Sequence, residues 1–330
     1  MNSTAIGTAR LCLPDRRLDY ADVLAQRNRK FQGKTYVAEL DILIPTTIIA
    51  GALPGPTAFI TSGIHGAEYC GIAAVMKLAR KTNPGDVQGS LIILHCCNQK
   101  AFYGHTIGIM PEDGLNLNRA FPTSDKSTHT HRVASFLEGI VDAYCDYHID
   151  VHSGDANEAL SPHCYYSANE ELGPIAERSR AMALHADMPF AVATWANHCV
   201  YQNSNFRGVP SVLLEMGEQG RWSNAEAEEY CRRIERLLGH IGVLEQPAVP
   251  PLPTADITKA KYLEAPEQGC WIADIAPGQR FAPGERLGSI YDFFGNELAR
   301  ITAREAGTVL YMTSSLSISK GSPLIAYACQ

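Results

Sequence analysis

The sequence contains no Cys-x-x-Cys pair, no apolar run approaching the ~20 residues of a membrane span, and no excess of basic residues. The first absence removes support for a thiolate zinc site or a dithiol redox motif. The second predicts no membrane-spanning helix, and the formal net charge of -7 leaves no basic footprint for nucleic acid. Residues 1–17 also lack the apolar core of a secretory signal, so we expect a cytoplasmic protein.

The bulk composition is that of an ordinary folded protein. Hydrophobic residues make up 45% of the 330 positions and charged residues 19%, values typical of a globular chain. This length suits one large domain followed by a small one. Ten cysteines are scattered through apolar stretches, so we expect buried free thiols in a reducing compartment rather than disulfides. The composition leaves the oligomeric state open, and a homo-oligomer is compatible with it.

Between about residues 35 and 245, short apolar runs alternate with helical patterns, which is typical of an α/β sheet. The predicted strands are Val37–Ile44, Ala58–Thr61, Leu91–Cys96, His148–Val151, Pro189–Thr194 and Ser211–Leu214. The predicted helices are Glu68–Lys81, Thr128–Tyr144, Glu170–Ala186 and Asn224–Leu238. The segment 99–127 is too long and too rich in Gly and Pro for a simple connection, so we expect a functional loop.

A stiff proline-rich linker is predicted at residues 247–254. It divides an α/β domain, residues 1–246, from residues 255–330, whose Gly, Pro and β-branched residues predict a small β-sandwich domain. In this tail, Phe281–Ile290 and Ile318–Tyr327 share the pattern apolar-x-x-Gly-x-x-Leu-x-x-apolar at an offset of 37 residues. The repeat predicts two strand–turn–strand arms, although Gly-bearing turns also recur by coincidence in β regions.

Two residues three apart, His65 and Glu68, lie where a predicted strand turns into a helix. This spacing lets one nitrogen and one oxygen aim at a single point beyond the strand end, which suits zinc. His152 ends another predicted strand, at the edge where open α/β sheets bind ligands. Side chains alternate along a strand, so Asp150 lies on the same side as His152 and would orient an imidazole. We therefore predict one zinc ion on His65, Glu68 and His152, with water in the fourth position.

Glu215 follows a third apolar strand, where a carboxylate is costly to desolvate without a function or a nearby cation. We predict that Glu215 is a general base, which takes a proton as zinc-activated water attacks a carbonyl and then passes it to the leaving amine. In the long loop, Asn118 and Arg119 offer an amide and a two-pronged donor, which suits a substrate carboxylate.

Each motif alone also has an ordinary structural explanation. A Glu often begins a helix because of the helix dipole, and Arg119 would serve equally well to satisfy loop carbonyls. The metal site is favoured because His65 with Glu68, His152 and Glu215 all fall at the carboxyl ends of predicted parallel strands.

Taken together and in this order, His65-x-x-Glu68, Asn-Leu-Asn118-Arg119-x-Phe-Pro, Asp150-x-His152 and Glu215-x-Gly217 resemble the succinylglutamate desuccinylase/aspartoacylase family. The resemblance covers most of the chain, from about residue 35 onward. It implies a three-layer, zinc carboxypeptidase-like α/β core with a mainly parallel or mixed sheet, followed by a small β domain. It also implies zinc on the same three ligands, Glu215 as catalytic acid/base, and Asn118 with Arg119 as anchors for the substrate carboxylate.

One departure from the family pattern concerns the oxyanion. The family usually has a further arginine several residues before Asn-Arg, but no arginine occurs here between Arg80 and Arg119. His105, another loop or zinc alone would have to take its place, because losing one such donor costs ~3 kcal/mol in other enzymes. Arg207 is a second candidate contact for an anionic group, with a solvated surface arginine as the ordinary alternative.

The hypothesis is therefore a zinc-dependent hydrolase that cleaves the amide bond of a small N-acyl amino acid or related N-acyl amine. Two alternatives stay open: a zinc carboxypeptidase acting on short peptides, and a zinc-containing binding protein without catalysis. The missing arginine is the only sequence feature that favours the binding protein.

Overall fold

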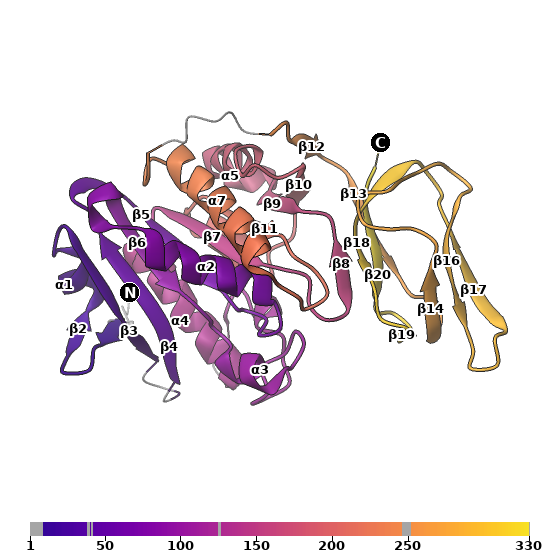
Figure 1. Ribbon diagram of the computed structural model, residues 1–330, viewed down its shortest axis with the longest axis horizontal. Coiled ribbons are helices and arrows are strands. Elements are labelled where there is room, and N and C mark those ends of the chain that lie inside the picture. Colours follow the sequence, from indigo (N-terminus) through magenta and orange to yellow (C-terminus); the bar gives the residue numbers. More distant parts are fainter. Residues whose placement is uncertain (1–8, 38–39, 41, 125–126, 246–251, 330) are drawn as a thin grey trace.

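The fold is described by a computed structural model for residues 9–37, 40, 42–124, 127–245 and 252–329 (Figure 1). Within these residues the helices are α1 (Tyr20–Leu24), α2 (Tyr69–Lys81), α3 (Gln99–Gly104), α4 (His129–Tyr144), α5 (Pro174–Leu184), α6 (Val200–Phe206) and α7 (Asn224–His240). None of the described helices is long and apolar enough to cross a bilayer.

One large sheet runs through the α/β core. Its strands, in spatial order and within the described part of the chain, are β12 (Ala255–Ile257), β10 (Phe190–Thr194), β9 (His163–Ser167), β11 (Ser211–Glu215), β7 (Tyr147–His152), β5 (Leu53–Ser62), β6 (Gln88–Leu94), β4 (Ile42–Ala50), β3 (Arg29–Val37), β1 (Arg10–Cys12) and β2 (Arg17–Asp19). The central strands β11, β7, β5 and β6 are parallel, whereas β9 and β4 run antiparallel to their neighbours in this block. The carboxyl ends of the central strands therefore meet at one edge.

Alternation along the strands makes the sheet apolar on both faces. Ala58 and Ile60 pack with the buried sides of α2, α5 and α7, whereas Phe59 between them packs with α1 and α4 on the opposite face. Two helical layers therefore enclose the sheet, which gives a three-layer α/β core. This confirms the predicted fold class.

The C-terminal part is a sandwich of two antiparallel sheets around a separate core that includes Trp271, Leu287, Val309 and Leu324. One sheet contains β13 (Ala260–Glu264), β20 (Pro323–Cys329), β18 (Gly307–Thr313) and β15 (Arg280–Phe281), with β8 (Glu158–Leu160) added beside β18. The other contains β17 (Glu297–Thr302), β16 (Arg286–Tyr291), β14 (Gly269–Ala273) and β19 (Ser317–Ile318).

The internal repeat corresponds to two similar arms, β15–turn–β16 and β19–turn–β20, each of which passes from one sheet to the other. Gly284 and Gly321 occupy the turns with φ values of 84° and 79°, a backbone conformation that favours glycine. The repeated leucines, Leu287 and Leu324, are both fully buried. The shared pattern thus specifies a glycine turn followed by a core leucine.

Two strands pair with partners on the other side of the predicted domain boundary. β12 pairs with β10 in the large sheet, and β8 pairs with β18 in the sandwich (Figure 1). Most of the predicted linker, residues 247–251, lies outside the described residues. The division at 247–254 into residues 1–246 and 255–330 stays a prediction, and each side contributes a strand to the sheet of the other.

Two predicted elements were wrong in detail. The strand predicted at Val37–Ile44 spans a reversal of the chain, because Val37 ends β3 and Ile42 begins β4, and these two residues pair antiparallel. The helix predicted at Glu170–Ala186 begins only at Pro174, after Gly173 adopts a φ of 50°. The ten cysteines are free, as expected, but Cys12, Cys145, Cys270 and Cys329 are only partly buried.

Candidate metal centre and active site

The turn after β5 brings His65 and Glu68 to the carboxyl edge of the sheet. Gly63 has a φ of 61°, and a Cβ on it would lie 2.9 Å from the Cα of Cys96. Gly66 is equally constrained, because its Cβ would lie 2.2 Å from the backbone nitrogen of Phe102. The two glycines let the chain reverse tightly against its neighbours before α2 begins, which presents both side chains outside the strand end.

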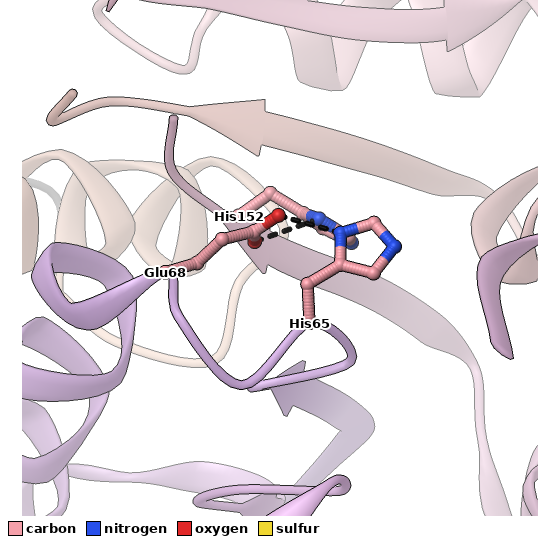
Figure 2. A group of neighbouring side chains, drawn as sticks. All are labelled: His65, Glu68 and His152. Atoms are coloured by element: carbon pink, nitrogen blue, oxygen red, sulfur yellow. Dashed lines mark hydrogen bonds and ion pairs between the residues drawn. The ribbon is translucent and has the colours of Figure 1, made fainter. Parts of the chain in front are cut away.

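His65, Glu68 and His152 converge as predicted (Figure 2). One ligand atom from each residue can be chosen so that all three lie within 4.8 Å of one another. The Nδ1 of His65 lies 2.6 Å from Oε1 of Glu68, and the Nδ1 of His152 lies 2.9 Å from Oε2. Two imidazoles and one carboxylate are a donor set that zinc commonly takes in hydrolases. The group could therefore hold a metal ion.

The outer contacts of the two imidazoles suit metal binding. The Nε2 of His65 lies 3.0 Å from the carboxamide oxygen of Asn116, and the Nε2 of His152 lies 3.0 Å from Oδ2 of Asp150. Both partners are acceptors, so each Nε2 carries a proton and donates it. Each Nδ1 can then direct a lone pair towards a cation beside Glu68, which is the usual tautomer of a metal-bound histidine with an outer acceptor.

The electrostatics of the cluster also fit a cation. Burial by itself would raise the pKa of Glu68, but the adjacent His152 and His65 lower it to about 2. Burial would lower the pKa of His152, but Glu68 and Asp150 raise it well above its usual value. The pKa of His65 is likewise raised by Glu68 against the effect of burial. In each case the surroundings favour positive charge next to an ionised Glu68.

Glu215 ends β11 directly beside His152, its partner in the parallel pairing with β7. Its Oε2 is buried and has no hydrogen-bond partner. Burial raises the pKa of Glu215 well above the usual range, against the effect of His152, and the charge of Glu68 raises it further. A carboxyl group with an elevated pKa beside a candidate metal group is suited to proton transfer.

The long loop carries Asn118 and Arg119 to the same region. Asn116 accepts the backbone N–H of Asn118 at 2.8 Å with the same oxygen that contacts His65. The carboxamide oxygen of Asn118 accepts from the N–H of Val200, which leaves its amide NH2 as the group free to meet a carboxylate. Arg119 is exposed, and one of its terminal nitrogens contacts its neighbour's carbonyl and the sulfur of Cys199.

Comparison with known proteins decides the family. The family model of the succinylglutamate desuccinylase/aspartoacylase catalytic domain matches residues 54–241, more than half of the chain. The chain belongs to this family. The resemblance noted in the sequence is thereby confirmed.

Relatives of the chain within and around this family include enzymes with named activities. The chain is 28% identical over 280 residues to N-alpha-acetyl-L-2,4-diaminobutyric acid deacetylase of Halomonas elongata, with 80% of this chain and 78% of the relative covered. A succinylglutamate desuccinylase/aspartoacylase of Rhodobacter sphaeroides has a TM-score of 0.81 at 23% identity, covering 96% of this chain and 98% of its own. The product-bound ectoine utilization protein EutE (DoeB) of Ruegeria pomeroyi has a TM-score of 0.82 at 24% identity, covering 92% and 97%. At these identities the two solved structures establish the fold.

Arg207 does not lie with the rest of the candidate site in this family member. It precedes β11 at the edge of the sheet opposite Glu215, and its guanidinium pairs with Asp142 and lies 3.8 Å from Glu138. These contacts explain the arginine as a link between α6 and α4. This position gives no support to the prediction that Arg207 contacts the substrate.

The position of His105 bears on the prediction that this residue replaces the missing oxyanion arginine. It is exposed at the end of α3, with a φ of 52°, and its Nδ1 lies 2.9 Å from the hydroxyl of Tyr69. Its described contacts therefore give no support to the prediction that it replaces the missing loop arginine.

The structure also brings residues outside the predicted set to this region. His163 of β9 pairs with Glu215 on the other side of β11, and its buried Nε2 has no hydrogen-bond partner. From the sandwich, Tyr311 of β18 pairs with Leu160 of β8. Burial raises the pKa of Tyr311, and the nearby charges of Glu158 and Glu215 raise it further. Burial, with the charge of Asp155, raises the pKa of Glu158 to about 7. The pairing of β9 with β11 brings His163 to the site, and the pairing of β8 with β18 brings Glu158 and Tyr311 there. No sequence pattern indicates either pairing.

Proposed function

We propose that the protein is a zinc-dependent amidohydrolase that cleaves a small N-acyl amino acid or a related N-acyl amine. The proposal depends on one observation above all: two separate parts of the chain bring His65 with Glu68 and His152 to one point, next to the unpaired carboxyl oxygen of Glu215. Membership of a family of desuccinylases and aspartoacylases, and a relative that is a deacetylase, support the reaction class.

When bound by His65, Glu68 and His152, zinc would supply Lewis acidity, which polarises a carbonyl and lowers the pKa of water. Glu215 would take the proton of the water that attacks the acyl carbon. As the carbon–nitrogen bond breaks, the protonated Glu215 would deliver this proton to the leaving nitrogen. The products are a free carboxylate and an amine. Burial raises the pKa of Glu215, which favours the protonated form that the second transfer needs. The first transfer needs the ionised form, which an adjacent zinc cation would favour.

Arg119 and Asn118 would hold the carboxylate of the amino acid portion. The exposed guanidinium of Arg119 offers a forked donor, and the amide NH2 of Asn118 lies on the adjacent residue. The link from Asn118 through Asn116 to His65 would keep this anchor at a constant position relative to the metal ligands.

The Arg119→Ala variant tests this anchor. We expect KM for a carboxylate-bearing N-acyl amino acid to rise by about 10- to 100-fold, since a charge-assisted contact worth about 1.5–3 kcal/mol is lost, with a smaller effect on kcat. Steady-state kinetics with a matched substrate amide, which lacks the carboxylate, provides the control. Equal losses for both substrates would contradict an anchor for the carboxylate.

The sandwich favours small substrates over peptides. Tyr311 and Glu158 lie on the face of its sheet away from the sandwich core, whereas Ala159 and Met312 between them point into that core. The sandwich thus closes one side of the site.

A hydrolysis panel of acetyl-, succinyl- and peptidyl-amino acids with the zinc-loaded protein tests the function. We expect turnover of an N-acyl amino acid and little of the peptides. The absence of turnover for the whole panel, with binding retained, would instead support a non-catalytic zinc protein.

A further inference from the structure

A chain of buried hydrogen bonds extends behind the candidate metal ligands. Asp150 contacts His152 with one oxygen, and its other oxygen, Oδ1, accepts from the hydroxyl of Thr61 at 2.7 Å. The same hydroxyl lies 2.9 Å from Nε2 of His148, and the Nδ1 of His148 lies 2.9 Å from the hydroxyl of Ser204 on α6. All five side chains are at most 1% exposed, so water does not compete for these contacts.

The number of protons available on each side chain determines which group donates in each hydrogen bond of this series. The carboxylate oxygens of Asp150 accept two hydrogen bonds, Oδ1 from the hydroxyl of Thr61 and Oδ2 from the Nε2–H of His152. The oxygen of Thr61 must then accept from His148, whose Nε2 carries a proton. Burial lowers the pKa of His148 to about 4, so its ring is neutral and its Nδ1 is an acceptor. The hydroxyl of Ser204 completes the series by donating to this Nδ1, although the carbonyl of Val200, 3.0 Å away, competes for the same proton.

We infer that Thr61 and His148 are positioning residues for the metal centre, which act through Asp150 to hold the ring of His152 in its metal-binding tautomer. The Nε2–H of His148 and the hydroxyl of Thr61 both point towards Asp150, so the carboxylate is held between two neighbouring strands, β5 and β7. A carboxylate fixed in this way accepts the Nε2–H of His152, so the Nδ1 of the same ring faces Glu68, where the cation would bind. This inference rests on the proposed zinc site and goes beyond it by assigning roles to residues that touch neither metal nor substrate.

The series also ends on α6, which contacts the predicted carboxylate anchor. Ser204 lies on the helix whose first residue, Val200, donates its N–H to Asn118. Helix α6 therefore contacts both the hydrogen-bond series behind His152, through Ser204, and the predicted carboxylate anchor, through Val200.

The Thr61→Val variant removes the hydroxyl and keeps the shape of the side chain. We expect the zinc dissociation constant, measured by chelator competition on the full-length protein, to rise by about 10- to 100-fold, as is typical when an outer partner of a ligand is lost. Thr61→Ser restores the hydroxyl and should bind zinc within about threefold of the original protein. A matched control is Thr47→Val: Thr47 is equally buried, hydrogen-bonds a histidine, His95, at 2.8 Å, and lies two strands away. Its zinc affinity should not change.

A second measurement needs no substitution. Nitrogen NMR of the histidine side chains should find His148 as a neutral ring protonated on Nε2 in both zinc-free and zinc-loaded protein. A folded Thr61→Val variant that binds zinc like the original, or a His148 ring protonated on Nδ1, would overturn the inference. An unsubstituted protein that binds no zinc would refute the metal site itself, and the affinity series distinguishes this result from a failure of Thr61 alone.

Discussion

Replacing Glu215 by Gln should lower kcat by about 10²- to 10⁴-fold while leaving the metal content of the protein unchanged, because an amide neither takes nor delivers the proton. The substitution keeps the size of the side chain at the end of β11, so the neighbouring His152 and its contacts with Glu68 and Asp150 should persist. Steady-state kinetics on the best N-acyl amino acid of the panel, together with metal analysis, measures both effects.

A suitable control for this variant is Glu226→Gln, which neutralises an exposed carboxylate in the first turn of α7. It should leave kcat unaltered. If the Glu215→Gln protein kept a substantial part of the original kcat, Glu215 would not be the general base, and the buried oxygen without a partner would need another explanation.

Replacing His152 by Ala should abolish stoichiometric zinc binding and, with it, turnover. His152 is one of only two imidazoles in the predicted ligand set, and a site of one imidazole and one carboxylate is too poor to retain zinc through dialysis. Its removal also takes one imidazole partner away from each of the buried carboxylates Glu68 and Asp150, so the thermal unfolding temperature of the zinc-free variant should fall. Metal analysis and a thermal unfolding curve should be recorded on the same sample.

The matched control is His185→Ala, because His185 is an exposed histidine at the end of α5, stacked on His240. This variant should retain a full complement of zinc. Full retention of zinc by a folded His152→Ala protein would remove this residue from the ligand set and would require a different metal site or none.

The sequence was sufficient to predict that His65, Glu68 and His152 converge, because these residues lie at strand ends. Parallel strands in the centre of the sheet bring their carboxyl ends to one edge, so short motifs at the ends of β5, β7 and β11 must be neighbours in space. The same regularity places Asp150 on the His152 side of β7, and the structure shows the contact between them. Prediction succeeded here because it needed only strand order and side-chain alternation.

Arg207 and His163 show where this reasoning ends. Arg207 stands eight residues before Glu215 in the sequence, but β11 carries the chain across the sheet between them, so the two residues lie at opposite edges. His163 has no motif around it and reaches Glu215 only because β9 runs antiparallel to β11. Its position depends on a pairing between strands that are distant in the sequence. A pattern of apolar residues predicts a strand but not the strand with which it pairs.

The contribution of the sandwich could not be predicted for a similar reason. The repeat of Gly284 and Gly321 indicates how the sandwich folds upon itself. The short strand β8, which joins the sandwich to the core and positions Glu158 and Tyr311, has only three residues. Such a strand is stabilised by its partner β18 and not by any periodicity of its own.

The most direct test of the account is a crystal structure of the zinc-loaded protein with anomalous diffraction data collected at the zinc absorption edge. The account predicts one zinc peak per chain, bonded to Nδ1 of His65, the carboxylate of Glu68 and Nδ1 of His152, with one coordination position open on the side of Glu215. A peak bound by other residues, or no peak in a protein that hydrolyses N-acyl amino acids, would contradict it.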